Sequence, residues 1–131
     1  MAPEIDIAMA AGSLRKGVET LLAGWGERTA IPLEIWALPP ENAALPAATV
    51  ELVLNVLLDA LTAAERAHTI SVAVTVGRTV RLTVSDDGPG PYEAGQADKS
   101  AFGKIAAALG GNYRMTAVPG HGATVSLELP T

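Results

Sequence analysis

The apolar positions along the chain follow two kinds of spacing, one typical of helices and one typical of strands. Leucine, valine and tryptophan recur every three or four residues in residues 7–28, and apolar side chains fill one face of residues 47–66 in the same way. Residues 99–109 repeat this spacing and stop at a pair of glycines, as a glycine-capped helix does. These three segments are therefore predicted to be helices.

Strict alternation of apolar and polar residues predicts the strands. Residues 70–76 and 80–84 place Val, Ile or Leu at every second position and are joined by a glycine-containing turn, which indicates a hairpin with one buried face. Residues 31–36 alternate in a similar way. Residues 113–118 and 124–129 flank a Pro-Gly turn and predict a second hairpin.

The order of these elements predicts the fold class. Each strand has one apolar face and each helix one apolar stripe, so the simplest packing is an α+β fold: a two-layer α/β sandwich with a mixed five-stranded sheet and three helices on one face. The 131 residues suit a single domain spanning residues 1–131. Because 49% of the residues are hydrophobic and only 4% aromatic, the core is expected to be aliphatic, and Trp25 and Trp36 are interpreted as core or interface residues.

Composition and charge exclude several classes of protein. The chain has no cysteine, which excludes disulfides and cysteine-based zinc sites. Its net charge is −5 and its nine basic residues are scattered, so we expect no nucleic-acid partner. No apolar run approaches the ~20 residues of a membrane helix, and the first residues do not resemble a signal peptide. We therefore expect a cytoplasmic protein with no membrane segment in this chain.

The first candidate for chemistry is an Asp-x-Gly-x-Gly motif formed by Asp86, Gly88 and Gly90 at the end of a predicted strand. An aspartate in this position presents its carboxylate to a ligand while the glycines let the backbone turn tightly. The carboxylate would accept a hydrogen bond from an amino group and would repel guanine, which offers an oxygen at the same place. Taken alone, the motif is more often an ordinary acidic turn.

The second candidate is a polar stripe on the helix predicted for residues 47–66. Its members are spaced by four, three and four residues, so they share one side of the helix. On its own, such a stripe is a solvated helix face; next to the Asp-x-Gly-x-Gly motif we interpret it as the wall of a pocket. The stripe consists of Asn55, Asp59, Thr62 and Arg66.

The ordered set of motifs resembles the GHKL superfamily of ATP-binding domains. The set is a polar-striped helix, a hairpin, Asp-x-Gly-x-Gly, a helix ending in Leu-Gly-Gly and a final hairpin with Gly-x-Gly. Residues 50–66 and 107–130 are most similar to sensor histidine kinases of the short-lid, nitrate-sensor type. The resemblance implies the GHKL (Bergerat) fold, ATP and Mg²⁺ as cofactors, and a two-component signalling role.

The same resemblance implies roles for individual residues. Asp86 would accept a hydrogen bond from the adenine amino group, and Gly88 and Gly90 would let the backbone approach the base. Asp59 stands where the family has a Glu or Asn that positions Mg²⁺ or water, which makes it the candidate catalytic and metal-binding residue. Arg66 stands where a basic residue lies near the phosphates.

Several positions depart from the family pattern. The family's Mg²⁺-binding Asn falls on Ala63, which has no ligand atom. The Thr that supports the adenine-binding Asp falls on Ala123; Thr124 is the neighbouring candidate, although it should face the other side of the strand. The second glycine box, whose backbone N–H groups hold phosphates, falls on residues 96–99, where Lys99 is the one residue that offsets the loss.

These departures leave two main functions open, beside a third, an anti-sigma-type kinase acting on serine, which would need the same missing Mg²⁺ ligand. The first is an ATP-binding kinase domain that presents ATP to a phosphoacceptor histidine. Neither His68 nor His121 lies on a long amphipathic helix, so that histidine would lie on another segment or chain. The second is a degenerate GHKL-like module that no longer uses ATP and serves phosphotransfer or partner docking, similar to alphaproteobacterial histidine phosphotransferases. The expected partners are a phosphoacceptor helical domain or the receiver domain of a response regulator, and a homodimer is also open.

Overall fold

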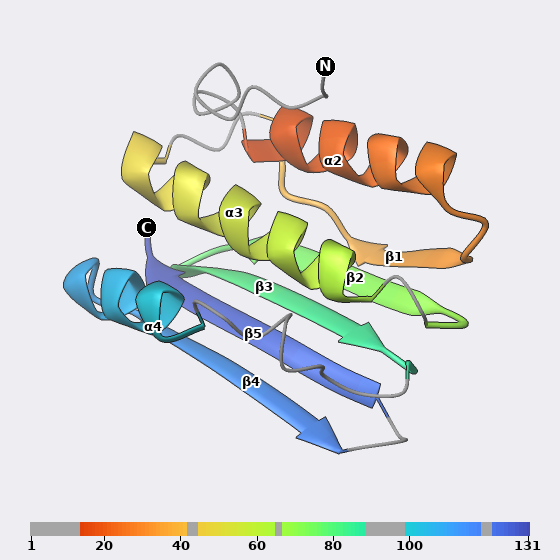
Figure 1. Ribbon diagram of the computed structural model, residues 1–131. Coiled ribbons are helices and arrows are strands. Elements are labelled where there is room, and N and C mark those ends of the chain that lie inside the picture. Colours follow the sequence, from red (N-terminus) through yellow and green to blue (C-terminus); the bar gives the residue numbers. More distant parts are fainter. Residues whose placement is uncertain (1–13, 42–44, 65–66, 89–98, 119–121) are drawn as a thin grey trace.

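The computed structural model describes residues 14–41, 45–64, 67–88, 99–118 and 122–131 of the chain. In this part of the chain the helices and strands follow one another in the order that the sequence predicts. Figure 1 shows the helices lying side by side above the sheet. The helices are α2 (Leu14–Arg28), α3 (Ala47–Ala63) and α4 (Lys99–Ala108).

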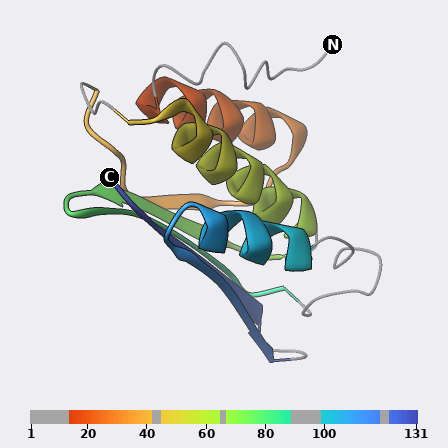
Figure 2. The same cartoon turned by 90° about the vertical axis from the view of Figure 1, so that its left-hand side faces the viewer.

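Five strands form one mixed sheet in the order β1-β2-β3-β5-β4. The pair β1 and β2 is parallel, and the other neighbouring pairs are antiparallel. Figure 2 shows that the helices cover one face of the sheet and leave the other face open. The predicted α+β sandwich is therefore confirmed. The strands are β1 (Leu33–Ala37), β2 (Ile70–Val76), β3 (Thr79–Asp86), β4 (Asn112–Val118) and β5 (Gly122–Pro130).

Helix α3 is the centre of the core, because it contacts both α2 and α4 and lies against β3 and β5. Nine of its 17 residues are buried, which explains its continuous apolar sequence. Trp25 of α2 is fully buried, and its indole Nε1 donates to the carbonyl oxygen of Leu61 at 3.0 Å. Each fully buried Leu or Val contributes roughly 1.5–3 kcal/mol to stability. The buried residues of α3 therefore stabilise the packing of the helices against the sheet. Within the described residues, no helix has both the length and the apolar character that a bilayer crossing requires.

The boundaries of some elements differ from those predicted. Residues 31–36 were predicted as a strand, but β1 begins at Leu33, because Pro32 has no N–H for the ladder. The carbonyl of Pro32 instead accepts a hydrogen bond from the backbone N–H of Ile70 at 3.1 Å. Residues 7–13 and 65–66 of the two predicted long helices lie outside the described residues.

Alternation along β3 separates the two faces of the sheet. Val80, Leu82 and Val84 are buried on the face beneath the helices. The residues between them point to the open face. Asp86 comes two positions after Val84 and is the last residue of the strand, so its side chain lies on the covered face, where the buried series ends.

Candidate functional site

Asp86 occupies the point at which the apolar covered face meets the loop after β3. Its side chain is partly buried, and its Oδ1 accepts a hydrogen bond from the backbone N–H of Gly88 at 2.8 Å. Burial raises the pKa of Asp86; the Gly88 N–H lowers it in part, and the nearby charge of Asp87 raises it further. The carboxylate is thus held in one orientation in a partly dry setting, where its hydrogen bonds are stronger than in water.

Two glycines let the backbone pass close to Asp86. A Cβ on Gly88 would lie 3.1 Å from Oδ1 of Asp86 and 3.4 Å from Cα of Ala67. Gly122 has a φ of 104°, and a Cβ there would overlap the carbonyl oxygen of Asp86. In the sequence, Gly122 is recognisable only as part of a Gly-x-Gly turn. In the structure it allows β5 to begin directly beside the aspartate.

The Asp87 side chain links the end of β3 to residues 68–69, which precede β2, by hydrogen bonds. Its Oδ1 accepts from the backbone N–H groups of His68 at 2.7 Å and Thr69 at 2.9 Å, and its Oδ2 accepts from the Thr69 hydroxyl at 3.3 Å. Hydrogen bonds from Thr69 and His68 hold the pKa of this exposed carboxyl below its ordinary value. Asp87 is not one of the residues that define the Asp-x-Gly-x-Gly motif, yet it holds residues 68–69 next to the end of β3.

Tyr113 of β4 is a second polar residue on the covered face of the sheet, where it pairs with the buried Leu127. Asp59 is partly buried on α3, one turn before the helix ends. Burial and the negative charge of Asp59 together raise the pKa of Tyr113 to about 12. The Tyr113 ring packs edge-on against Phe102 of α4, with ring centres 5.6 Å apart. Its hydroxyl is buried and has no hydrogen-bond partner among the described residues, which is uncommon for a buried polar group.

The polar stripe of α3 divides into two kinds of residue. Asn55 and Thr62 are exposed, and each side chain donates to a carbonyl of its own helix at 2.9 Å. This is how a solvated helix face behaves. Among the three stripe members that the structure describes, Asp59 is the one in a partly buried setting.

The remaining candidates are placed as follows. Thr124 lies on the open face, where its hydroxyl is 3.1 Å from the Ser85 hydroxyl, so it is separated by the sheet from Asp86. Lys99 is the first residue of α4, but its side chain lies outside the described part. Arg66 and Gly90 also lie outside the described residues. The structure therefore brings together Asp86, Gly88 and the residues 67–69 that precede β2.

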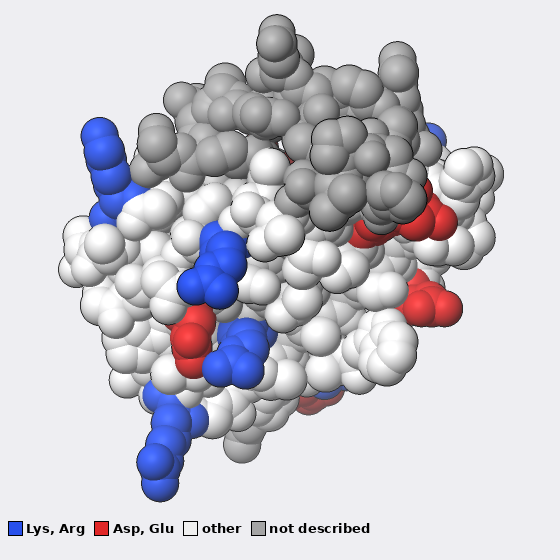
Figure 3. All heavy atoms as spheres, turned by 90° about the horizontal axis from the view of Figure 1, so that it is seen from below, with Lys and Arg blue, Asp and Glu red and all other residues white. Residues whose placement is uncertain are grey.

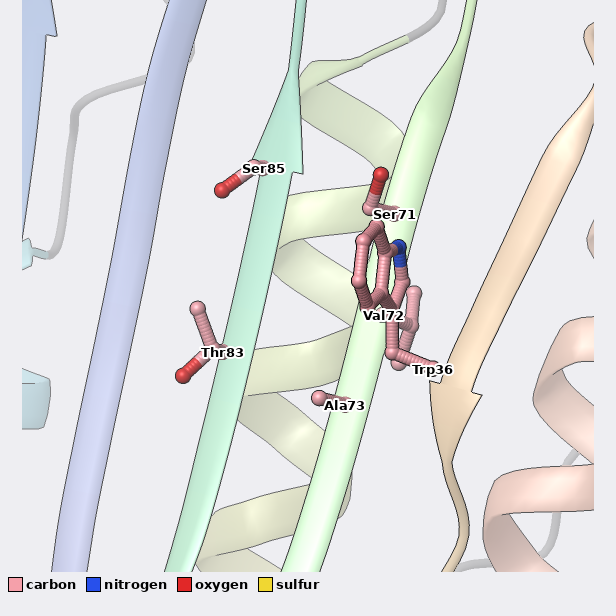
Figure 4. Close-up of a pocket in the computed structure, with 6 residues that line it drawn as sticks. All are labelled: Trp36, Ser71, Val72, Ala73, Thr83 and Ser85. Atoms are coloured by element: carbon pink, nitrogen blue, oxygen red, sulfur yellow. The ribbon is translucent and has the colours of Figure 1, made fainter.

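The open face carries a hollow of about 470 Å³. Figure 4 shows its lining: the Trp36 indole lies over β2, and Thr83 and Ser85 of β3 flank it. Trp36 is 74% exposed, so of the two tryptophans only Trp25 belongs to the core. Seen from below, where the sheet is uncovered, an acidic side chain lies beside basic ones on a mostly uncharged surface (Figure 3). The hollow offers small hydroxyl side chains and one large aromatic group.

Comparison with solved structures shows the same fold in a light-sensing kinase, whereas no protein-family model and no curated protein matches the chain. The blue-light activated histidine kinase of Erythrobacter litoralis EL346 superposes with a TM-score of 0.65 at 19% identity, over 93% of this chain and 43% of that one. The histidine kinase domain of the same protein superposes with a TM-score of 0.61 at 23% identity, over 99% of this chain and 65% of that one. The chain thus has a fold found in histidine kinases and spans less than two thirds of either structure.

Proposed function

We propose that the chain is an ATP-binding domain of histidine-kinase type, which holds Mg-ATP on the covered side of the sheet, beside the end of β3. It presents the γ-phosphate to a phosphoacceptor histidine on a helical domain elsewhere. The observation that carries this proposal is the partly buried Asp86 carboxylate, held by Gly88 at the end of the central strand β3. The likeness of the fold to a histidine kinase domain supports it.

The chemistry of the site follows from two carboxylates. Asp86 accepts a hydrogen bond from the adenine amino group, and Gly88 lets the base approach the backbone. A hydrogen bond to a charged group of this kind contributes roughly 1.5–3 kcal/mol. Asp59 supplies the oxygen for Mg²⁺ or its water, because Ala63, one turn later, has no ligand atom. Phosphoryl transfer then depends on positioning and on neutralising the charge of the phosphates.

Calorimetry with ATP and Mg²⁺ tests the proposal. The wild-type chain is expected to bind ATP, and Asp86→Asn is expected to bind at least about tenfold more weakly, since a loss of 1.4 kcal/mol is tenfold in affinity. GTP serves as the matched ligand control and is expected to give no heat, because its base carries an oxygen in place of the amino group. Absence of heat with ATP for the wild type contradicts the proposal.

A second candidate function is a docking module that has kept the fold and no longer uses ATP. Ala63 and Ala123 stand where the family has polar groups, and Trp36 is exposed beside the hollow on the open face. Exposed tryptophans are enriched in protein interfaces, so this face suits a partner such as a receiver domain. Detection of ATP-dependent phosphate transfer to a partner histidine removes this alternative.

A further inference from the structure

The open face of the sheet carries opposite charges at its two edge strands. In the middle of the face, Arg81 of β3 and Glu128 of β5 form an ion pair at 2.9 Å. Glu34 lies at one edge, on β1, where its Oε1 accepts a hydrogen bond from the Ser71 hydroxyl at 3.3 Å. Arg114 lies at the other edge, on β4. Neither Glu34 nor Arg114 is in an ion pair with another described residue, so these two charges are not compensated within the face.

The size of the side chains also differs between the two halves of this face. The register of β1 against β2 shifts between Ile35 and Ala37, which leaves Trp36 as the unpaired residue of a bulge. A bulge re-aims a side chain, and the Trp36 indole lies over β2 (Figure 4). On the other side of β3 the open face of β5 carries the small residues Thr124 and Ser126, and a second hollow, of about 330 Å³, lies over β3, β5 and β4.

A second copy of the chain complements this distribution of size and charge. In a two-fold interface the same surface of both copies meets itself. With the axis parallel to the strands and along the central strand β3, the β1 side of each copy faces the β4 side of the other. The Trp36 indole then lies against the small residues of β5, and Glu34 faces the strand that carries Arg114. An axis across the strands would instead place each of these charges against its own equivalent, and like charges in an interface repel.

The register of the sheet brings the two charges within reach of each other. The row of paired residues that begins with Glu34 crosses the sheet and ends at Thr116 of β4. Arg114 lies two residues before Thr116, which is about 7 Å along the strand. A long arginine side chain can span this offset, because its charged group lies at the end of a flexible stem.

The open face is large enough for a weak contact. Five strands about 4.8 Å apart, with about seven residues each, give a face of roughly 500 Å² per copy. Two copies together cover roughly 1,000 Å², which is the lower limit of a specific interface. Sheets that pack face to face keep their strands within about 30° of each other, as an axis parallel to the strands allows. The dimer is therefore expected to dissociate on dilution, and the fold of each copy does not depend on it.

We propose that the chain forms a homodimer through the open faces of its sheets. Glu34 of each copy pairs with Arg114 of the other, and Trp36 of each copy packs on the small residues of the other copy's β5. The dimer leaves the covered side free, including the proposed nucleotide site at Asp86, so this inference does not rest on ATP binding. It assigns the open face to a second copy of the chain instead of to a receiver domain.

Sedimentation equilibrium of the full chain tests the pairing of charges. The wild type is expected to form dimers as its concentration rises towards about 1 mM. Glu34→Arg and Arg114→Glu are each expected to weaken association at least about tenfold, because like charges then face each other. An equimolar mixture of the two variants is expected to regain dimers. In the mixed dimer the introduced cation faces the introduced carboxylate, and the native pair remains intact at the other end of the interface.

Two further variants test the position of the interface. Trp36→Ala is expected to weaken association at least about tenfold, as loss of a central aromatic contact does, and to leave ATP affinity equal to that of the wild type. Glu27→Arg is the matched control, because it makes the same change of charge at an exposed position on α2. It is expected to leave the dimer unchanged.

Three results would overturn this inference. The first is a wild type that stays monomeric up to about 1 mM; if a receiver domain then binds in a manner that depends on Trp36, the face belongs to that partner. The second is a dimer that Trp36→Ala does not weaken, because the contact would lie elsewhere. The third is a mixture of the two charge variants that stays monomeric. None of these results bears on ATP binding, which calorimetry tests separately.

Discussion

The covered face and the open face of the sheet are built from the same strands, yet their side chains differ in kind. On β3 and β5 the covered face carries only aliphatic residues between the strand ends, and these are almost completely buried. The open face of the same strands carries Ser, Thr, Arg and Glu, including the ion pair between Arg81 and Glu128 at 2.9 Å. The difference shows that stability is concentrated on one face, while the other face is free to vary. The candidate nucleotide site lies at Asp86, at the end of β3, where the buried apolar residues of the covered face end.

The largest expected effect comes from shortening a side chain on the covered face. Leu127 is 1% exposed, and its position pairs with Leu82 on β3 and Tyr113 on β4. Leu127→Ala is expected to lower the free energy of unfolding by about 2–5 kcal/mol, because it removes buried methyl groups and leaves a cavity. Urea denaturation measures this loss.

Ser126→Ala is the matched control on the open face, one residue earlier in the same strand. Its effect is expected to stay within about 0.5 kcal/mol. Equal losses for the two variants would break the comparison, because they would mean that the open face is also covered in the folded protein.

A smaller effect is expected where β5 begins beside Asp86. Gly122 has a φ of 104°, and a Cβ there would overlap the Asp86 carbonyl oxygen. Gly122→Ala is expected to cost roughly 1–3 kcal/mol through backbone strain and displacement of the strand end. Gly77→Ala, with no atom within 4 Å of its Cβ, is expected to be nearly neutral. An intact unfolding temperature for Gly122→Ala would show that Asp86 is not held by β5.

Local patterns in the sequence were sufficient to predict the layers of the fold. Alternation in β2 and β3 and the apolar face of α3 depend on neighbours within one element, and they placed the buried residues correctly. The same alternation placed Asp86 at the end of a strand and Thr124 on the opposite face. The start of β1 was predicted too early. The spacing of apolar residues does not show that Pro32 has no N–H to donate to a neighbouring strand.

Contacts between distant segments could not be predicted from these patterns. Asp87 receives hydrogen bonds from residues 18 and 19 positions earlier, and this depends on β2 and β3 being neighbours with a particular register. The contact of α4 with α3 likewise joins segments that lie far apart in the chain. The exposure of Trp36 follows from the edge position of β1, which no local spacing indicates.

The smallest expected effect, and the sharpest test of the border between the two faces, compares Asp87→Asn with Asp86→Asn. The folded-state pKa of Asp87 is depressed, so ionised Asp87 stabilises the fold above its ordinary value of 3.8, and this contribution is lost as the pH falls through the lower folded value. Asp87→Asn is therefore expected to unfold at a lower temperature than the wild type at pH 7, with the difference disappearing in acid.

Asp86 is expected to behave in the opposite sense, because its folded-state pKa is raised. Its contribution to stability is present in full below the ordinary value of 3.8 and is lost as the pH rises through the folded value. At pH 7 the ionised wild-type side chain thus destabilises the fold slightly, and Asp86→Asn is expected to unfold at the same or a higher temperature while binding ATP more weakly. Thermal unfolding of both variants between pH 3 and pH 7 measures the two trends. A stability loss at pH 7 for Asp86→Asn as large as that for Asp87→Asn would mean that Asp86 stabilises the fold as its neighbour does. That result would contradict the proposal that the Asp86 carboxylate binds a ligand.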